Sequence, residues 1–398
     1  MQILFYIPDI NQTWGGVRQY AITLLKMLQK DFENHYYIYH DLNDSDILEA
    51  IDQIPNQTLV TTEIIKDPKI ITVKVPDKRF SRIPGLRRLK VEQQVIIESD
   101  LAAYCKKHGI QTIYCPYQFI PKVDNVKLIT TLHDVQELHF PEFFSAEDRA
   151  YRATSYLDFL RRADAVVVSY QHIKDDLIKY FNVPSSKINV ILLEMQNLWF
   201  EKFSNSNSID ISVLDLPENF LLYPANTWKH KNHLRLIKAI AEARERYNVI
   251  INLVCTGHKN EHYSEIEKLI HHLKLEDQIF FTGIVEENIL YSLYETSRGV
   301  VIPTTYEAGS FPLYESIFLN VRVICSNVTS LPETIGKNEY VFNPFEVKEI
   351  TDLIIKLWND HMFREKNLEH IVGRAKYLTS KNNSLSKITS VYSTLNES

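Results

Sequence analysis

The sequence predicts an α/β protein built from two Rossmann-like, doubly wound domains. Short apolar runs rich in β-branched residues alternate with longer stretches of helical spacing along most of the chain. This alternation is the pattern of parallel strands joined by helices. A polar run at 204–208, Ser-Asn-Ser-Asn-Ser, lies near the middle and predicts a linker. The 398 residues are enough for two domains of ordinary size, each with its own core.

The composition excludes several classes of protein. A hydrophobic content of 45% and a net charge of −6 are globular values, and the charge gives no reason to expect binding to nucleic acid. No apolar run approaches the ~20 residues that cross a bilayer. The N-terminal residues predict a first strand and lack the basic leader of a signal peptide. Four cysteines lack CxxC spacing, which favours free thiols in a reducing compartment. We therefore expect a cytoplasmic protein, with any membrane contact peripheral.

The strongest candidate site is a strand, a turn and a helix within residues 298–316. Val300 to Ile302 predicts a buried strand, and a helical pattern begins near Phe311. Glu307 and Glu315 flank the turn, and their carboxylates can accept hydrogen bonds from hydroxyls. The backbone N–H groups at the predicted helix N-terminus belong to Gly309, Ser310 and Phe311. Such an end receives phosphate well, so a nucleotide-sugar site fits, although an ordinary crossover with two surface glutamates stays open.

The same segment resembles a known family signature. Residues 307–315 are Glu-Ala-Gly-Ser-Phe-Pro-Leu-Tyr-Glu. They are similar to the Glu-x7-Glu core of the retaining glycosyltransferases of family 4, usually Glu-Gly-Phe-Gly-Leu-Pro-x-x-Glu. The two glutamates and the proline occupy the same positions as in the family core, whereas the glycines occupy different positions. The resemblance implies the GT-B fold, in which two Rossmann-like domains face a cleft. It also implies that Glu315 accepts hydrogen bonds from ribose hydroxyls and Glu307 from donor-sugar hydroxyls.

Two positions in the N-terminal half also match the family. Gly15 and Gly16 precede a helix predicted from about Val17 to Lys30, which suggests a close backbone approach or a tight turn. In the resembling family this loop faces the cleft and helps to hold the donor or acceptor. His133 follows a predicted strand at 128–132, where a side chain faces the crevice of a doubly wound sheet. The resemblance places this histidine beside the donor sugar, and a structural histidine is the alternative.

The second half supplies the rest of the expected donor site. The family usually has an arginine and, five residues on, a lysine that grip the diphosphate. Lys231 fits the lysine, and Asn226 occupies the arginine position. A unit charge ~4 Å from a phosphate contributes about 4 kcal/mol at an effective dielectric of about 20. A helix end contributes about 0.3–2 kcal/mol. Lys231 should therefore dominate. By resemblance, backbone near Gly257, Gly283 and Val285 holds the nucleotide.

One segment is unusually basic. Residues 78–90 contain six basic residues and no acid, interleaved with apolar side chains. Each such charge contributes about 1 kcal/mol near an anionic leaflet. The arginines of interest are Arg79, Arg82, Arg87 and Arg88. We expect this segment to meet a membrane surface or an anionic lipid-linked acceptor, with a solvated loop as the alternative.

A metal site is not expected. Asp44-Ser45-Asp46 has the Asp-x-Asp pattern that holds a metal in the other main glycosyltransferase fold, but it lies in a loop-like stretch without a preceding apolar strand. His230 and His233 are too few ligands for a closed zinc site. No cofactor is expected either, because the nucleotide sugar is a substrate and Lys231 with the helix end neutralises the leaving group.

Together these patterns predict a retaining, metal-independent hexosyltransferase. It would move a hexose, with mannose as a candidate, from a GDP- or UDP-linked donor to a saccharide or lipid-linked saccharide in cell-surface polysaccharide (lipopolysaccharide) synthesis. Residues 1–203, joined by a C-terminal helix in 379–398, would bind the acceptor, and 218–378 the donor. His133, Lys231 and Glu307 would be catalytic. The alternatives are a nucleotide-sugar epimerase of the same fold and a non-catalytic nucleotide-sugar-binding protein. The expected location is the cytoplasm, with a peripheral position on the inner face of the cytoplasmic membrane as the alternative.

Overall fold

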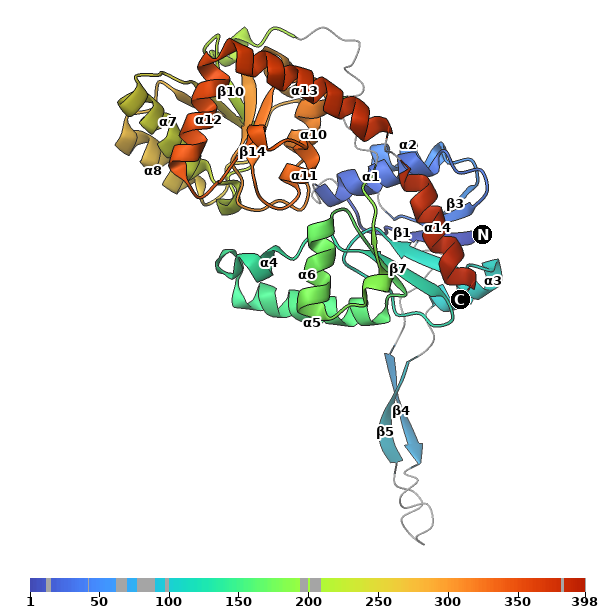
Figure 1. The fold of residues 1–398 in the computed structure, drawn as a ribbon. Coiled ribbons are helices and arrows are strands. Elements are labelled where there is room, and N and C mark those ends of the chain that lie inside the picture. Colours follow the sequence, from blue (N-terminus) through green and yellow to red (C-terminus); the bar gives the residue numbers. More distant parts are fainter. Residues whose placement is uncertain are drawn as a thin grey trace.

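A computed structural model describes residues 1–11, 16–41, 43–61, 100–193, 200, 209–380 and 383–397, and the backbone of 70–76 and 90–96. The chain folds into two α/β domains, each with a parallel sheet covered by helices (Figure 1). The predicted fold class is confirmed.

The N-terminal domain has a seven-stranded sheet in which all neighbours are parallel. The strand order is β3 (Gln57–Val60), β2 (His35–Tyr39), β1 (Gln2–Tyr6), β6 (Thr112–Cys115), β7 (Lys127–Thr131), β8 (Ala165–Val168) and β9 (Ile188–Val190). Both faces are buried, so the central strands are nearly continuous apolar runs. In β1, Ile3 and Phe5 join one core and Leu4 the other.

Two helical layers sandwich this sheet. One layer contains α1 (Gly16–Leu28), α2 (Ser45–Asp52) and α14 (Ser384–Glu397), which pack on the side of Ile3 and Phe5. The other contains α3 (Asp100–His108), α5 (Ala146–Arg162) and α6 (Gln171–Phe181), on the side of Leu4. Because parallel strands need crossover connections, the helices between them return the chain to the starting edge.

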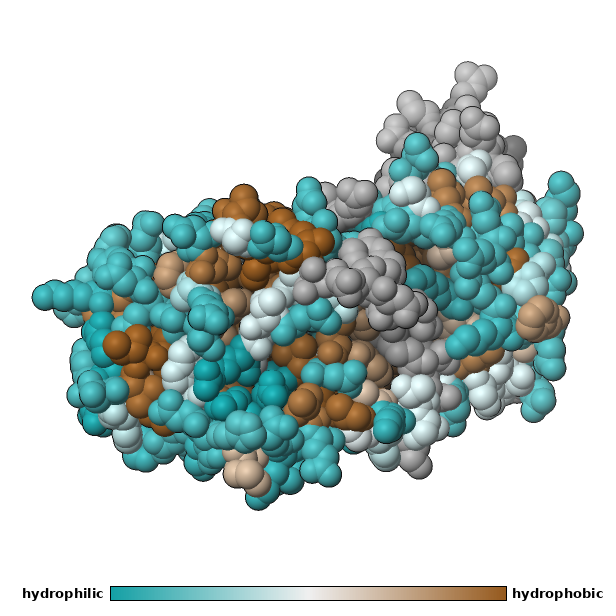
Figure 2. Space-filling view, turned by 90° about the horizontal axis from the view of Figure 1, so that it is seen from above, coloured by the Kyte–Doolittle hydropathy of each residue, from teal (hydrophilic) through white to brown (hydrophobic). Residues whose placement is uncertain are grey.

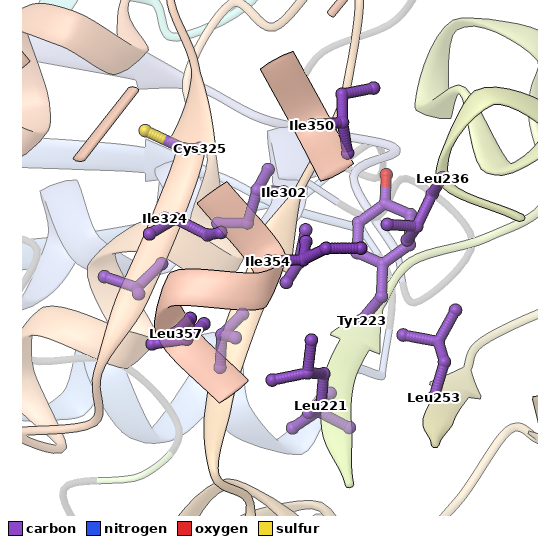
Figure 3. Packing of buried hydrophobic residues seen from close by; sticks show 14 of the residues in the cluster. Leu221, Tyr223, Leu236, Leu253, Ile302, Ile324, Cys325, Ile350, Ile354 and Leu357 are labelled. Carbon is purple, nitrogen blue, oxygen red and sulfur yellow. The ribbon is translucent and has the colours of Figure 1, made fainter. Parts of the chain in front are cut away.

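The C-terminal domain repeats this plan with a six-stranded parallel sheet. Its order is β12 (Ile279–Gly283), β11 (Leu253–Thr256), β10 (Leu221–Pro224), β13 (Gly299–Ile302), β14 (Val323–Ser326) and β15 (Val341–Phe342). Its helices are α7 (His233–Tyr247), α8 (Tyr263–Leu273), α9 (Glu287–Thr296), α10 (Phe311–Phe318), α11 (Leu331–Ile335), α12 (Val347–Asn359) and α13 (His361–Ser380). Figure 3 shows Ile350, Ile354 and Leu357 of α12 packed with side chains of the sheet.

The C-terminal helix α14 leaves the second domain and lies on the first (Figure 1). Ile388, Val391 and Tyr392 enter the core beside α1. Asn396 Nδ2 donates to the Thr112 hydroxyl at 3.1 Å and lies 3.6 Å from the Met1 sulfur, so the two chain ends are adjacent. The last helix therefore ties the two domains together.

An antiparallel ribbon that the sequence patterns did not predict extends from the N-terminal domain (Figure 1). It consists of β4 (Ile70–Pro76) and β5 (Lys90–Ile96). The basic segment with Arg79, Arg82, Arg87 and Arg88 falls between these strands and lies outside the described residues.

Within the described ranges, no helix is both long and apolar enough to span a bilayer. The face seen in Figure 2 is mainly hydrophilic and carries its apolar side chains in separate patches.

The Asp-x-Asp pattern, formed by Asp44 and Asp46, has a structural role. Strand β2 does precede it, but its two carboxylates bind Arg18 of α1. Arg18 is 7% exposed and donates to Asp44 at 2.7 and 2.8 Å and to Asp46 at 2.7 Å. Asp44 also caps α2, because its side chain accepts the Ile47 N–H. The pair therefore joins α1 to α2.

Asp44→Asn should lower the free energy of unfolding by about 2 kcal/mol, because it removes charge-assisted hydrogen bonds to a buried guanidinium. Asp46 is the matched control, since its carboxylate is 62% exposed. Asp46→Asn should cost less than about 1 kcal/mol. Urea unfolding of both variants measures the difference, and equal losses would contradict this role for Asp44.

Candidate active site

A cavity of about 720 Å³ lies between the two domains. Its walls come from segments that follow the carboxyl ends of strands in both sheets. His133 and Asp134 follow β7, and Tyr170 follows β8. On the other side, Asn226 follows β10 and Gly257 follows β11. Ligand sites of doubly wound sheets lie at such strand ends, which makes this cavity the candidate active site.

The cavity brings together most of the residues singled out in the sequence. Those on its wall are Gly16, His133, Asn226, Lys231, Gly257, Val285, Glu307, Gly309, Phe311 and Glu315. Gly283 and Ser310, both predicted to hold the donor, do not line it. The Gly283 carbonyl instead accepts the Gly257 N–H at 2.8 Å, and the Ser310 side chain is buried at the start of α10. Gly15 lies outside the described residues.

Lys231 is ion-paired. Its Nζ lies 2.5 Å from Glu307 Oε1, and the two side chains are 17% and 10% exposed. The sequence patterns did not predict this ion pair, because the two residues are 76 positions apart. The cavity wall also carries Glu315 and Asp134, so carboxylates outnumber ammonium groups among its described residues.

The local backbone sets the position of Lys231. It ends a 3-10 turn at Lys229–Lys231, and its carbonyl accepts the Tyr223 hydroxyl at 2.8 Å. Asn232 follows with φ = 62°, a left-handed conformation that asparagine tolerates. Its side chain donates to the Pro303 and Pro344 carbonyls at 2.8 and 2.9 Å. The turn is thus fixed to the loop after β13 that carries Glu307.

The turn before α10 packs closely against the facing domain. A Cβ on Gly309 would lie 2.9 Å from the Tyr170 ring, and one on Gly16 would lie 3.2 Å from the Phe311 ring. Each glycine therefore admits an aromatic ring of the other domain. The α10 N-terminus faces the cavity beside this contact, because Gly309, Phe311 and Pro312 all line it.

The side chain of Glu315 is hydrogen-bonded to a buried tyrosine that does not line the cavity. Its side chain is 7% exposed and lines the cavity. The Tyr294 hydroxyl donates to Glu315 Oε2 at 2.5 Å. Tyr294 is fully buried in α9 and was not identified from the sequence, where it looks like any core aromatic.

His133 lies on the opposite wall as a neutral ring. Its Nε2 is 3.0 Å from the Pro116 carbonyl, which can only accept, so Nε2 carries the proton. Burial lowers the pKa of His133, and Tyr20 packs edge-on against its ring at 4.7 Å. The remaining nitrogen, Nδ1, is then a hydrogen-bond acceptor.

Tyrosines missed by the sequence analysis bridge the domains. The hydroxyls of Tyr170 and Tyr314 are 2.7 Å apart. Tyr306, next to Glu307, packs against the rings of His139 and Phe140, and its hydroxyl accepts the Val135 N–H at 3.4 Å. These contacts join sequence positions more than 140 apart, so no local pattern reveals them.

The described residues contain no group of three or more His, Cys, Asp or Glu side chains that could hold a metal ion. His233 instead packs between Tyr223 and Phe281, with centroid distances of 4.8 and 5.9 Å. It is 1% exposed and neither ring nitrogen has a hydrogen-bond partner. Burial lowers the pKa of His233 to about 3.

This burial predicts a pH-dependent stability. The unfolded chain takes up a proton on this histidine below about pH 6.5, while the folded state does not until about pH 3. The contribution of neutral His233 to the free energy of unfolding is therefore present above pH 6.5 and is lost as the pH falls. Between pH 7 and 5.5, the free energy of unfolding of His233→Leu should fall by about 1.3 kcal/mol less than that of the wild-type protein. Urea titrations at both pH values test this, and an effect as small as that of the exposed His272→Leu would contradict it.

Two family models match the chain. The model described as "Glycosyltransferase Family 4" matches residues 14–192, and "Glycosyl transferases group 1" matches residues 205–376. Among curated proteins, the chain is 24% identical to O-antigen chain mannosyltransferase B of Escherichia coli, covering 96% of this chain and 97% of that protein. It is 27% identical to O-antigen chain mannosyltransferase RfbU of Salmonella typhimurium, covering 67% and 74%.

Solved structures with the same fold cover nearly the whole chain. Alr3699/HepE of Anabaena, in complex with UDP and glucose, superimposes with a TM-score of 0.63 at 15% identity and covers all of both chains. WaaG, a glycosyltransferase involved in lipopolysaccharide biosynthesis, gives a TM-score of 0.62 at 14% identity and covers 98% of each chain. At such identities the likeness establishes the fold.

Proposed function

This chain belongs to the family 4 glycosyltransferases of the GT-B fold, and from that premise we propose a specific reaction for it. It transfers mannose, or a closely related hexose, from a nucleoside-diphosphate sugar to a saccharide or lipid-linked saccharide acceptor with retention of configuration. The names of the curated relatives support mannose and O-antigen-type surface polysaccharide. The relatives are transferases, so the epimerase alternative is not favoured.

One observation carries the proposal: Lys231 and the Gly309 turn line the same interdomain cavity. A departing diphosphate develops negative charge, and it would be stabilised by the ammonium on one side and the α10 N–H groups on the other. Glu307 holds Lys231 before the donor binds. Donor binding then exchanges partners, because the diphosphate takes Lys231 and the carboxylate is released to the sugar hydroxyls.

The chemical step follows from this arrangement. The bond between the anomeric carbon and the phosphate oxygen breaks, while the acceptor oxygen forms its bond to the same carbon on the same face. The acceptor proton passes to the leaving phosphate, so no separate base is required. A double displacement needs a carboxylate nucleophile that is free to attack the anomeric carbon, and in the donor complex the Glu307 carboxylate accepts hydrogen bonds from the sugar hydroxyls. Front-face substitution is therefore the proposed route to retention.

In this proposal, the remaining residues of the cavity wall bind the nucleotide and the donor sugar. Glu315 accepts hydrogen bonds from the ribose hydroxyls, and Asn226, Gly257 and Val285 hold the rest of the nucleotide. His133 meets the donor sugar with its acceptor nitrogen Nδ1, whose lone pair suits a sugar hydroxyl. The proposal requires no metal ion, because Lys231 and the helix end balance the leaving charge.

The proposal extends to the acceptor and the location. A lipid-linked acceptor would place the protein at the cytoplasmic face of the membrane, with the basic segment at 78–90 as its contact with the anionic surface or acceptor. Co-sedimentation with anionic liposomes that is unchanged when Arg79, Arg82, Arg87 and Arg88 become serine would contradict that contact.

A ligand panel followed by a transfer assay tests the reaction. Thermal shifts with UDP, GDP, ADP and dTDP identify the nucleotide, since a ligand at about 100 times its Kd adds about 2.7 kcal/mol to stability. The matching mannose donor should then release nucleoside diphosphate only with a saccharide acceptor, giving a product of unchanged anomeric configuration by proton NMR. Sugar interconversion without an acceptor would support an epimerase. Binding without diphosphate release in any acceptor mixture would support a non-catalytic protein.

A further inference from the structure

Tyr294 does not line the cavity, but its hydroxyl is hydrogen-bonded to Glu315, which does. It is fully buried in α9, and its hydroxyl oxygen is 2.5 Å from Glu315 Oε2 on α10. The contact joins two different crossovers of the C-terminal domain, between β12 and β13 and between β13 and β14. Tyr294 itself is absent from the cavity wall, so a bound ligand would not contact it.

The direction of this hydrogen bond is fixed by chemistry. An ionised carboxylate only accepts, and a tyrosine hydroxyl has one proton to donate. Burial is the largest cause that raises the pKa of Tyr294 well above its usual value, so the proton stays on the hydroxyl. The Tyr294 hydroxyl therefore donates its proton to Glu315 Oε2, which is held on the side of the tyrosine and away from the cavity.

The carboxylate of Glu315 consequently has a fixed orientation before any ligand arrives. Its side chain is 7% exposed and reaches the cavity from the second turn of α10. A long side chain that is ordered only on binding reduces affinity, and one that is ordered beforehand does not. Tyr294 supplies this ordering during folding.

We propose that Tyr294 is a positioning residue for nucleotide recognition, which aligns Glu315 with the ribose hydroxyls of the donor. The inference rests on the proposed function, in which Glu315 binds the ribose. In this proposal, the hydrogen-bonded pair of Tyr294 and Glu315, and not Glu315 alone, distinguishes nucleotides that have ribose hydroxyls from those that lack them.

The test compares a nucleotide with its analogue that lacks the two ribose hydroxyls. Calorimetry measures the Kd of UDP or GDP, whichever binds the wild-type protein more tightly, and of its 2′,3′-dideoxy form. Tyr294→Phe should raise the Kd of the ribonucleotide about tenfold, the usual effect of a hydrogen bond to a charged group. It should leave the Kd of the dideoxy form within about twofold, because that ligand has no hydroxyl for Glu315.

Two further variants sharpen the result. Tyr340→Phe is the matched control, since Tyr340 is a fully buried tyrosine of the same domain that neither lines the cavity nor contacts Glu315 through a hydrogen bond. It should change neither Kd. Glu315→Gln should remove the preference for the ribonucleotide, and adding Tyr294→Phe to it should bring no further loss, because the two residues act as one unit. Thermal melts confirm that each variant is folded.

The contradicting outcomes are separable. A folded Tyr294→Phe variant that weakens both ligands equally, or neither, would overturn the positioning role. If the wild-type protein prefers the ribonucleotide and Tyr294→Phe keeps that preference, only this inference is wrong. If the wild-type protein binds none of UDP, GDP, ADP and dTDP, the proposed function is wrong and the inference falls with it.

Discussion

Lys231→Ala should lower the turnover of sugar transfer by roughly 100- to 1,000-fold, the range for losing one preorganised donor to a developing charge. The ammonium lies at the junction of the cavity and the loop after β13, where it meets Glu307. Its loss removes the only described lysine or arginine on the cavity wall. It also leaves three carboxylates facing an anionic leaving group. Steady-state release of nucleoside diphosphate measures the effect.

Lys229→Ala is the matched control for this experiment. Lys229 belongs to the same 3-10 turn, but its side chain is exposed and does not line the cavity. It should retain turnover within about threefold, as expected of a surface substitution. A folded Lys231→Ala protein with near-normal turnover would mean that another group stabilises the diphosphate.

Glu307→Gln should tighten the binding of free nucleoside diphosphate while it slows sugar transfer. The ion pair with Lys231 must open before a phosphate can take the ammonium, and the carboxylate then stands close to a second anion. Two unit charges of like sign ~5 Å apart repel by about 3 kcal/mol at an effective dielectric of about 20. The neutral amide removes this repulsion, so the Kd should fall on the order of 10- to 100-fold. Transfer should fall at least tenfold, because an amide is a weaker acceptor for the sugar hydroxyls.

Calorimetry with the nucleoside diphosphate and a transfer assay on the same preparation separate these opposite effects. Glu267→Gln, on the exposed face of α8, removes the same charge from a residue that does not line the cavity and should change neither quantity. Weaker binding of free diphosphate by Glu307→Gln would show that the carboxylate supports Lys231 instead of competing for it.

The fold followed from the sequence because its determinants are local. Alternating strand and helix patterns predicted parallel sheets, and the strands around Val301 and Ile129 formed close to their expected places. The apolar run at 250–254 also predicts a strand, but β11 begins only at Leu253, and Ile250 is 63% exposed and lies outside the sheet. The ribbon at 70–96 was missed because an isolated antiparallel pair leaves little periodic signal.

The candidate site was only partly predictable. A strand end and a helix N-terminus identified His133 and the Gly309 turn, and the family resemblance identified Lys231; the cavity brings all three together. The pairing of Lys231 with Glu307 joins positions 76 residues apart and depends on the loop geometry after β10 and β13. The contact of Gly309 with Tyr170 depends on how the domains face each other. Such relations become visible only in three dimensions.

We propose above all that the donor's diphosphate lies in the cleft between the Lys231 ammonium and the N-terminus of α10. A crystal structure with the preferred nucleoside diphosphate tests it most directly. We expect phosphate oxygens within hydrogen-bonding distance of both Lys231 Nζ and the backbone N–H groups at Gly309–Phe311, with Glu307 released from the lysine. A diphosphate bound elsewhere, with the Lys231–Glu307 ion pair intact, would contradict the account.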